Sequence, residues 1–289
     1  MKLFSFKTSI FSICALLILN TSAQTIPALS HTGYPSSSMF TEGSYKREQR
    51  IITKFKSPTA AIKDLQLNMR SVGRAYVQNS NGQTTASYTY TEISGIRRED
   101  GKVKDLGNPI EDKTEYAYVV VYDNESGQCV GVKGRPVYTN WVAENNVHDL
   151  NEGAYFMYFF HTEKPHSVGD VWTDSIFSFP LTNHIPMTFT FEGMETFQET
   201  ELKGKTGAKL NVSGNVNYQD VYGQVLNEQK ILNMKGTVSG TVHVDIKTNR
   251  ILRIKVVLNL EGTIETNGVK EPYTVEMKIN EWQMDPKML

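Results

Sequence analysis

The most constraining feature of this sequence is a strict alternation of apolar and polar residues. Its apolar or glycine positions are Leu232, Met234, Gly236, Val238, Gly240, Val242, Val244 and Ile246, and polar residues lie between them. Successive side chains of a β-strand point to opposite faces, whereas a helix would distribute the same residues around its surface. The segment therefore predicts a long strand with one apolar face and one wet face.

The same alternation recurs along the second half of the chain. The further segments are Met187–Phe197, Ala208–Tyr218, Leu252–Ile264 and Tyr273–Ile279, with predicted turns at Lys203-Gly204-Lys205, Gly223, Lys247-Thr248-Asn249 and Asn267-Gly268. Asn-Gly is a strong hairpin signal. Gly214, Gly236 and Gly240 fall on the apolar face, where glycine permits bending. These segments predict an antiparallel meander of long strands with a curved apolar face.

The first half of the chain carries a weaker pattern. Leu65 to Val77 suggests a strand, but Ser57-Pro58-Thr59 is also typical of a helix start, and the sequence does not decide between them. Tyr88 and Tyr90 lie in an alternating segment. We expect a central strand over 116–122, then a turn at 123–127 into a strand through Val130 and Val132. A short helix or loop is expected over 140–150, and a buried aromatic segment over 154–160.

These patterns predict a mainly β fold. We expect a long-stranded curved antiparallel sheet, either a half-barrel or a barrel-like sandwich, with few short helices. The apolar face could be covered by a second sheet, by a few helices or by an apolar ligand. We favour coverage by the chain itself. The β domain is expected over 45–289, with an alternative division into 45–165 and 166–289.

The N-terminus is typical of a secretory signal. Lys2 and Lys7 precede the apolar stretch Ile10–Leu19, and Ala23 ends a small-residue cleavage site, so we expect a signal over 1–23 and a linker or extended arm over 24–44. The apolar stretch is about half of the ~20 residues that span a bilayer. A transmembrane barrel is disfavoured because the aromatic residues do not gather at strand ends. We therefore expect an exported protein, in the periplasm, on the outer-membrane surface or in the medium, that is not transmembrane after signal removal.

Charge and cysteine content exclude several classes of protein. The formal net charge is -1 and no run of Lys or Arg stands out, so no nucleic-acid partner is expected. Cys129 is the one cysteine of the chain after the signal, so no internal disulfide can form.

No arrangement of residues predicts chemistry. His161 and His166 lack the spacing of a zinc site and are expected on the surface. Asp123-Asn124-Glu125 lacks the ligand ladder of a calcium loop. Trp282 follows the polar parity of its strand, so it is expected to be exposed, to be moved by a bulge, or to pack against a loop, which is favoured. The sequence predicts no catalytic residue, no metal and no cofactor.

The apolar face is the candidate site. Its proposed ligand-facing residues are Leu210, Val212, Val238, Val242, Ile254, Val256 and Leu258. The leading hypothesis is a non-enzymatic protein that binds a lipid-like apolar or amphipathic ligand on a curved sheet. The alternatives are an envelope scaffold that holds a protein partner through its edge or outer surface, and an enzyme with an unrecognised site.

One motif carries a family resemblance. Val168-Gly169-Asp170-Val171-Trp172, followed by Gly236-Thr237-Val238-Ser239-Gly240 and Asp245, resembles exported β-rich proteins of Bacteroidota of unassigned function. The similarity covers about Val168–Met284, and no functional residue is carried over with it. The wider architecture is similar to the half-barrels of periplasmic lipoprotein carriers, which implies an acyl-binding concave face but does not fix a function.

Overall fold

The fold is almost entirely β-structure, as predicted. The computed structural model describes residues 43–59, 63–107, 117–123, 129–133, 165–178, 183–225, 228–247 and 250–285. Its strands are β1 (Gly43–Lys56), β2 (Asp64–Ser80), β3 (Gln83–Glu99), β4 (Lys102–Asp105), β5 (Ala117–Asp123), β6 (Cys129–Lys133), β7 (Val171–Ser178), β8 (Asn183–Thr196), β9 (Thr206–Val225), β10 (Glu228–Asp245), β11 (Arg250–Thr266) and β12 (Val269–Met284), with one 3₁₀ turn, η2 (Thr200–Leu202), between β8 and β9.

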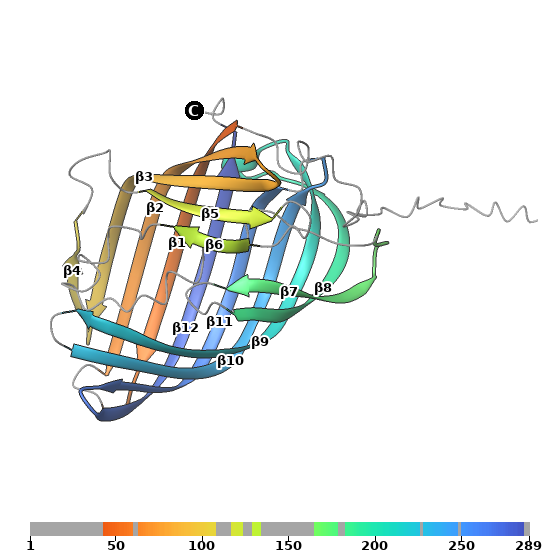
Figure 1. Cartoon of the computed structure of the whole chain (residues 1–289). Coiled ribbons are helices and arrows are strands. Elements are labelled where there is room, and N and C mark those ends of the chain that lie inside the picture. Colours follow the sequence, from red (N-terminus) through yellow and green to blue (C-terminus); the bar gives the residue numbers. More distant parts are fainter. Residues whose placement is uncertain are drawn as a thin grey trace, which may run out of the picture.

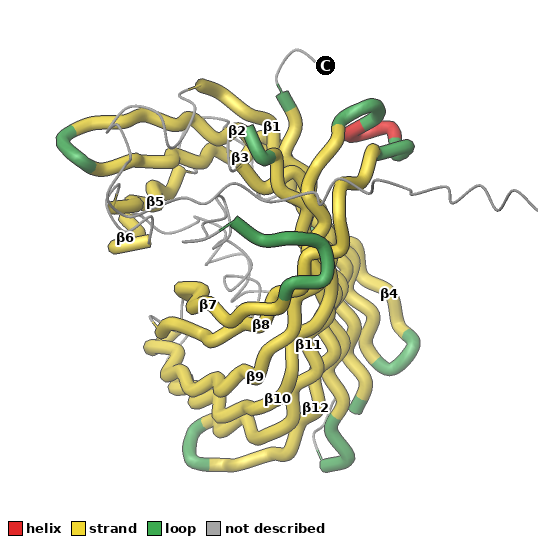
Figure 2. Tube along the Cα trace, turned by 90° about the vertical axis from the view of Figure 1, so that its right-hand side faces the viewer, coloured by secondary structure: helices red, strands yellow, loops and turns green. Residues whose placement is uncertain are grey.

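All described strands belong to one sheet. Its order is β6-β5-β3-β2-β1-β12-β11-β10-β9-β8-β7, with β4 paired to β3. The pairs are antiparallel, and β1 lies beside β12 in the middle, so the first and last described strands are neighbours. The sheet bends into a trough without closing (Figures 1 and 2). The half-barrel form of the prediction is therefore confirmed, and the sandwich form is wrong because the described strands make a single layer.

Hairpin turns set the register of the strands. Asn267 and Gly268 have φ values of 51° and 85°, as a two-residue turn that matches strand twist requires. Asn81-Gly82 and Asp100-Gly101 adopt the same positive φ values between β2, β3 and β4. The predicted turn at Gly223 is wrong because β9 continues to Val225. The turn at 203–205 is confirmed, since Gly204 lies between η2 and β9 with φ 79°.

One face of the sheet carries the main core, and we call it the inner face. Alternate residues of each long strand are buried there, including Phe55, Leu67, Phe189, Val242 and Met277. The sheet curves tightly at β10 and β11, where neighbouring backbones approach the inner-face glycines. A Cβ at Gly236 would overlap the carbonyl oxygen of Asn259 and lie 2.9 Å from the Cα of Leu260. Glycine on the apolar face is therefore a requirement of this bend.

Two β-bulges move apolar residues off the inner face. The β8–β9 register shifts between Phe191 and Gly193, and the β10–β11 register shifts between His243 and Val244. A bulge changes the face on which later side chains lie. Phe197 and Leu252, predicted to share the inner face, instead pack in a second cluster with Leu202, Trp282 and Met284.

The first half of the chain forms strands where the sequence left alternatives open. β2 begins at Asp64, so Leu65–Val77 is a strand. β5 pairs with β3 and β6, which confirms a central strand over 116–122. Strands from both 45–165 and 166–289 lie in the same sheet. The calls for 1–23, most of 24–44, 140–150 and 154–160 fall outside the described residues.

We predict that Gly236→Ala destabilises the protein by about 2–4 kcal/mol, because the added methyl group overlaps backbone and the sheet must unbend to admit it. Urea unfolding monitored by circular dichroism measures this loss. Ser239→Ala is the control, since Ser239 is exposed on the same strand and should change stability by less than about 0.5 kcal/mol. Equal stability of both variants would show that the close approach at Gly236 is absent.

Candidate functional site

The seven predicted ligand-facing residues lie together on the inner face. They occupy three adjoining rungs across β9, β10 and β11, namely Leu210–Val242–Ile254, Val212–Gly240–Val256 and Gly214–Val238–Leu258. Six of the seven are buried, and Leu258 is half-buried. The apolar residues of the three strands lie side by side because the antiparallel registers pair apolar positions with one another.

The apolar surface extends well beyond these seven residues. Further inner-face residues are Leu65 and Leu67 on β2, Ile51 and Phe55 on β1, Val275, Met277 and Ile279 on β12, and Met187, Phe189 and Phe191 on β8. All belong to one cluster of buried side chains. The inner face is therefore a continuous apolar lining of the trough, contributed by strands from both ends of the described chain.

A polar cluster interrupts this lining where β1 lies beside β12. The Arg47 guanidinium donates from Nε and Nη2 to the two carboxylate oxygens of Glu281, at 2.7 and 2.6 Å. The side-chain amides of Gln49 and Gln283 donate to the same carboxylate, at 3.0 and 3.1 Å. Glu281 and Gln283 are each only 1% exposed. The carboxylate thus accepts four N–H groups, which offsets much of the cost of burying its charge.

This cluster was not predicted from the sequence. Arg47 and Gln49 continue the parity of Ile51, and Glu281 and Gln283 continue that of Ile279. The signal in the sequence was a polar residue at a position where the alternation of the strand predicts an apolar one. Only the pairing of β1 with β12, far apart in the sequence, shows that these residues meet.

An aromatic stack lies between β8 and the segment that leads into β7. His166 stacks on Trp172 with ring centroids 3.6 Å apart, and Trp172 stacks on Phe189 at 5.7 Å. Gly169, with φ 90°, and the hydrogen bond from the Ser167 backbone N–H to the Asp170 carboxylate form the turn into β7. The expectation of a surface His166 is wrong, because this stack leaves it 8% exposed.

The opposite face, which we call the outer face, holds the second cluster. Trp282 is 4% exposed there, and the guanidinium carbons of Arg50 and Arg253 lie 5.1 and 5.9 Å from its ring centroid. Arg253 also pairs with Glu199 of the β8–β9 connection. Trp282 is therefore packed, as the favoured interpretation predicted. The registers of β12 with β1 and β11 have no bulge around it. The buried Trp282 ring removes the exposed aromatic patch that would have favoured the scaffold alternative.

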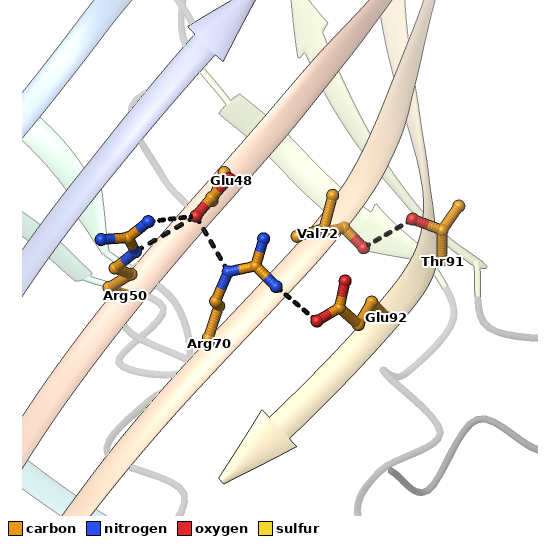
Figure 3. A network of polar contacts seen from close by, with 6 residues as sticks. All are labelled: Glu48, Arg50, Arg70, Val72, Thr91 and Glu92. Atoms are coloured by element: carbon orange, nitrogen blue, oxygen red, sulfur yellow. Dashed lines mark hydrogen bonds and ion pairs between the residues drawn. The ribbon is translucent and has the colours of Figure 1, made fainter. Parts of the chain in front are cut away.

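A charged network crosses the outer face beside Trp282. Glu48 accepts from Arg50 at 2.8 Å and from Arg70 at 2.9 Å, and Arg70 also pairs with Glu92 (Figure 3). Burial raises the pKa of Glu48, but the hydrogen bonds from Arg70 and Arg50 outweigh burial, so that the net pKa lies below its ordinary 4.5. The network ties β1, β2 and β3 together.

The described residues provide no site for metal chemistry. No group of three or more His, Cys, Asp or Glu side chains among them could hold a metal ion. A hollow of about 610 Å³ is lined by the exposed charged residues Lys56, Lys63, Lys235 and Glu261, together with buried Ser57 and half-buried Tyr273. No helix in the described part of the chain is long and apolar enough to cross a membrane.

Comparison with known proteins gives only remote structural similarity. No family model and no curated protein matches the sequence. One similar solved structure concerns lipid–protein interactions in lipovitellin, with 9% identity and a TM-score of 0.42 over 84% of this chain and 25% of that chain. Another is DynF from the dynemicin biosynthesis pathway of Micromonospora chersina, with 7% identity and a TM-score of 0.24 over 91% of this chain and 92% of that one. Scores this low identify neither family nor function, and the resemblance at Val168–Trp172 stays a prediction.

We predict that Glu48→Gln alters how stability depends on pH. Because the folded pKa is lowered, the Glu48 carboxylate stabilises the fold above pH 4.5, and this contribution disappears as pH falls through the lowered pKa. The difference in unfolding free energy between wild type and Glu48→Gln should therefore be largest near pH 6 and shrink towards pH 3, as measured by urea unfolding.

Glu92→Gln is the matched control for this measurement. This substitution removes the other carboxylate that pairs with Arg70. The Glu92 side chain is 46% exposed, so water screens its ion pair with Arg70. A pH-independent difference between wild type and Glu48→Gln would contradict the assigned role of Glu48.

Proposed function

We propose that this protein is exported and binds a lipid-like apolar or amphipathic molecule on its inner face. The observation that carries the proposal is the continuous apolar lining of an unclosed, curved sheet, centred on the rungs from Leu210 to Leu258. The inner face offers one long apolar lining along which a flexible chain would pack, and Leu258 is the half-buried member of the seven candidate residues.

The energetics favour an elongated apolar ligand. Removing apolar surface from water contributes about 25 cal/mol per Å², so a molecule that contacts several rungs gains from each contact. In the described part of the sheet, β6 and β7 each pair with one neighbour and lie at opposite ends of the strand order. The described sheet is therefore not closed between β6 and β7.

Export is the second part of the proposal. The positive start at Lys2 and Lys7, the apolar stretch Ile10–Leu19 and the small residues ending at Ala23 support a cleaved secretory signal. A hydrophobic molecule in an aqueous compartment outside the cytoplasm requires a protein that shields it from water. An exported half-barrel with an apolar lining fits that requirement.

The test is direct detection and uptake of ligand. The chain from Gln24 is purified from its own envelope, and native mass spectrometry identifies any amphiphile that it releases on gentle denaturation. The same protein is then delipidated and titrated with a fluorescent fatty acid. A co-purifying lipid and saturable uptake are expected. A clean apo mass with no uptake would overturn the proposal.

Adjacent residues on β11 locate the site. Leu258→Gln should weaken uptake about tenfold, or about 1.4 kcal/mol, because it places an amide among apolar contacts on the inner face. Asn259→Gln is the control, since Asn259 is exposed on the outer face one residue further along. Equal effects of the two variants would show that the ligand does not lie on the inner face. Circular dichroism and urea unfolding verify that both variants are folded.

A further inference from the structure

The inner face changes character along the two central strands. Its first two rungs pair Arg47 with Gln283 and Gln49 with Glu281, and its next three pair Ile51 with Ile279, Thr53 with Met277 and Phe55 with Val275. These two polar rungs lie towards one end of the trough, with the rung of Tyr45 and Ala75 beyond them, and the next three rungs are mainly apolar. We call the region of the two polar rungs the polar end. The candidate face adjoins this boundary, because Ile254 lies beside Glu281 and Val256 lies beside Ile279.

The neighbouring strand β2 follows the same division. Gly73 and Ser71 lie opposite Arg47 and Gln49, whereas Met69, Leu67 and Leu65 lie opposite the next three inner-face residues of β1. Small side chains thus accompany the polar rungs, and large apolar ones accompany the apolar rungs. The polar end is a feature of three adjacent strands.

The charges at the polar end are balanced. The Arg47 guanidinium and the Glu281 carboxylate form a bidentate pair, and Arg250, the other buried arginine at this end, pairs with Asp285 at 3.0 Å and lies over the Tyr45 ring. A phosphate or carboxylate would meet arginines that already face carboxylates. These rungs therefore favour a polar group without net charge.

One acceptor at the polar end remains unused. The side-chain nitrogen of Gln283 donates to Glu281, but its side-chain oxygen is buried and has no hydrogen-bond partner. A buried acceptor without a donor destabilises the fold, because it has lost its hydrogen bond to water without replacing it. A ligand group that donates a hydrogen bond would remove that cost, whereas a methyl group would not.

We propose that the ligand is amphipathic, with an uncharged head group that donates a hydrogen bond to the Gln283 side-chain oxygen. A hydroxyl or an amide N–H meets this requirement. The head lies against the Arg47–Gln283 and Gln49–Glu281 rungs, and the apolar chain runs along the rungs towards Phe55 and Val275. This assignment rests on the proposed function and adds the chemical class and the orientation of the ligand.

The experiment compares three probes of equal chain length on the delipidated chain from Gln24. Dodecane, 1-dodecanol and laurate are titrated at pH 7.5 by displacement of a fluorescent fatty acid. We expect 1-dodecanol to bind about tenfold more tightly than dodecane, because an unpaired buried acceptor strongly discriminates for a donor. Laurate, which is ionised at this pH, should bind less tightly than 1-dodecanol.

Two matched variants assign the preference to one atom. Gln283→Met removes the unused acceptor together with one N–H donor to Glu281, and should abolish the preference for alcohol while dodecane affinity stays the same. Gln49→Met removes an equivalent donor to Glu281 but leaves the Gln283 oxygen in place, and should retain the preference.

Each outcome decides between defined alternatives. Equal binding of 1-dodecanol and dodecane to wild type, tighter binding of laurate, or an unchanged preference in Gln283→Met overturns the head-group assignment but leaves the proposed function intact. The wild-type comparison decides the matter even if a variant fails to fold. Failure of all three probes and the fluorescent fatty acid to bind overturns the proposed function itself.

Discussion

The rest of the structure depends on a single curved sheet whose inner face holds the main core. A flat antiparallel layer with so much apolar surface would aggregate, and the described strands supply no second layer. At β10 and β11 the backbone passes so close to Gly236 and Gly262 that no side chain fits. Glycine at these positions therefore permits the curvature of the sheet around its core.

The seam between β1 and β12 concentrates the polar interactions of both faces. On the inner face it holds the pair of Arg47 with Glu281, and on the outer face it holds the network of Glu48 with Arg50 beside Trp282. Each group joins residues from opposite ends of the described chain. The seam thus joins the N-terminal and C-terminal strands of the described chain in one sheet. On its inner side it supplies the polar end of the apolar trough.

Alternation alone was sufficient to predict the long strands, the meander and the shared face of Leu210, Val242 and Ile254, because period-two patterning fixes which side chains lie together once registers are in phase. It failed at Phe197 and Leu252, because the parity of later side chains changes after a bulge. The turns Asn81-Gly82 and Asp100-Gly101 carried the same hairpin signal as Asn267-Gly268 and were predictable.

The sequence by itself determined the fold class and the apolar character of the inner face, since both follow from local alternation and turn residues. Only the tertiary structure decided that the sheet stays open, that Trp282 is covered by the β8–β9 connection, and that Arg47, Gln49, Glu281 and Gln283 form one cluster. The physical reason is that these features depend on long-range pairing, above all of β1 with β12, and no local pattern specifies which distant strands become neighbours.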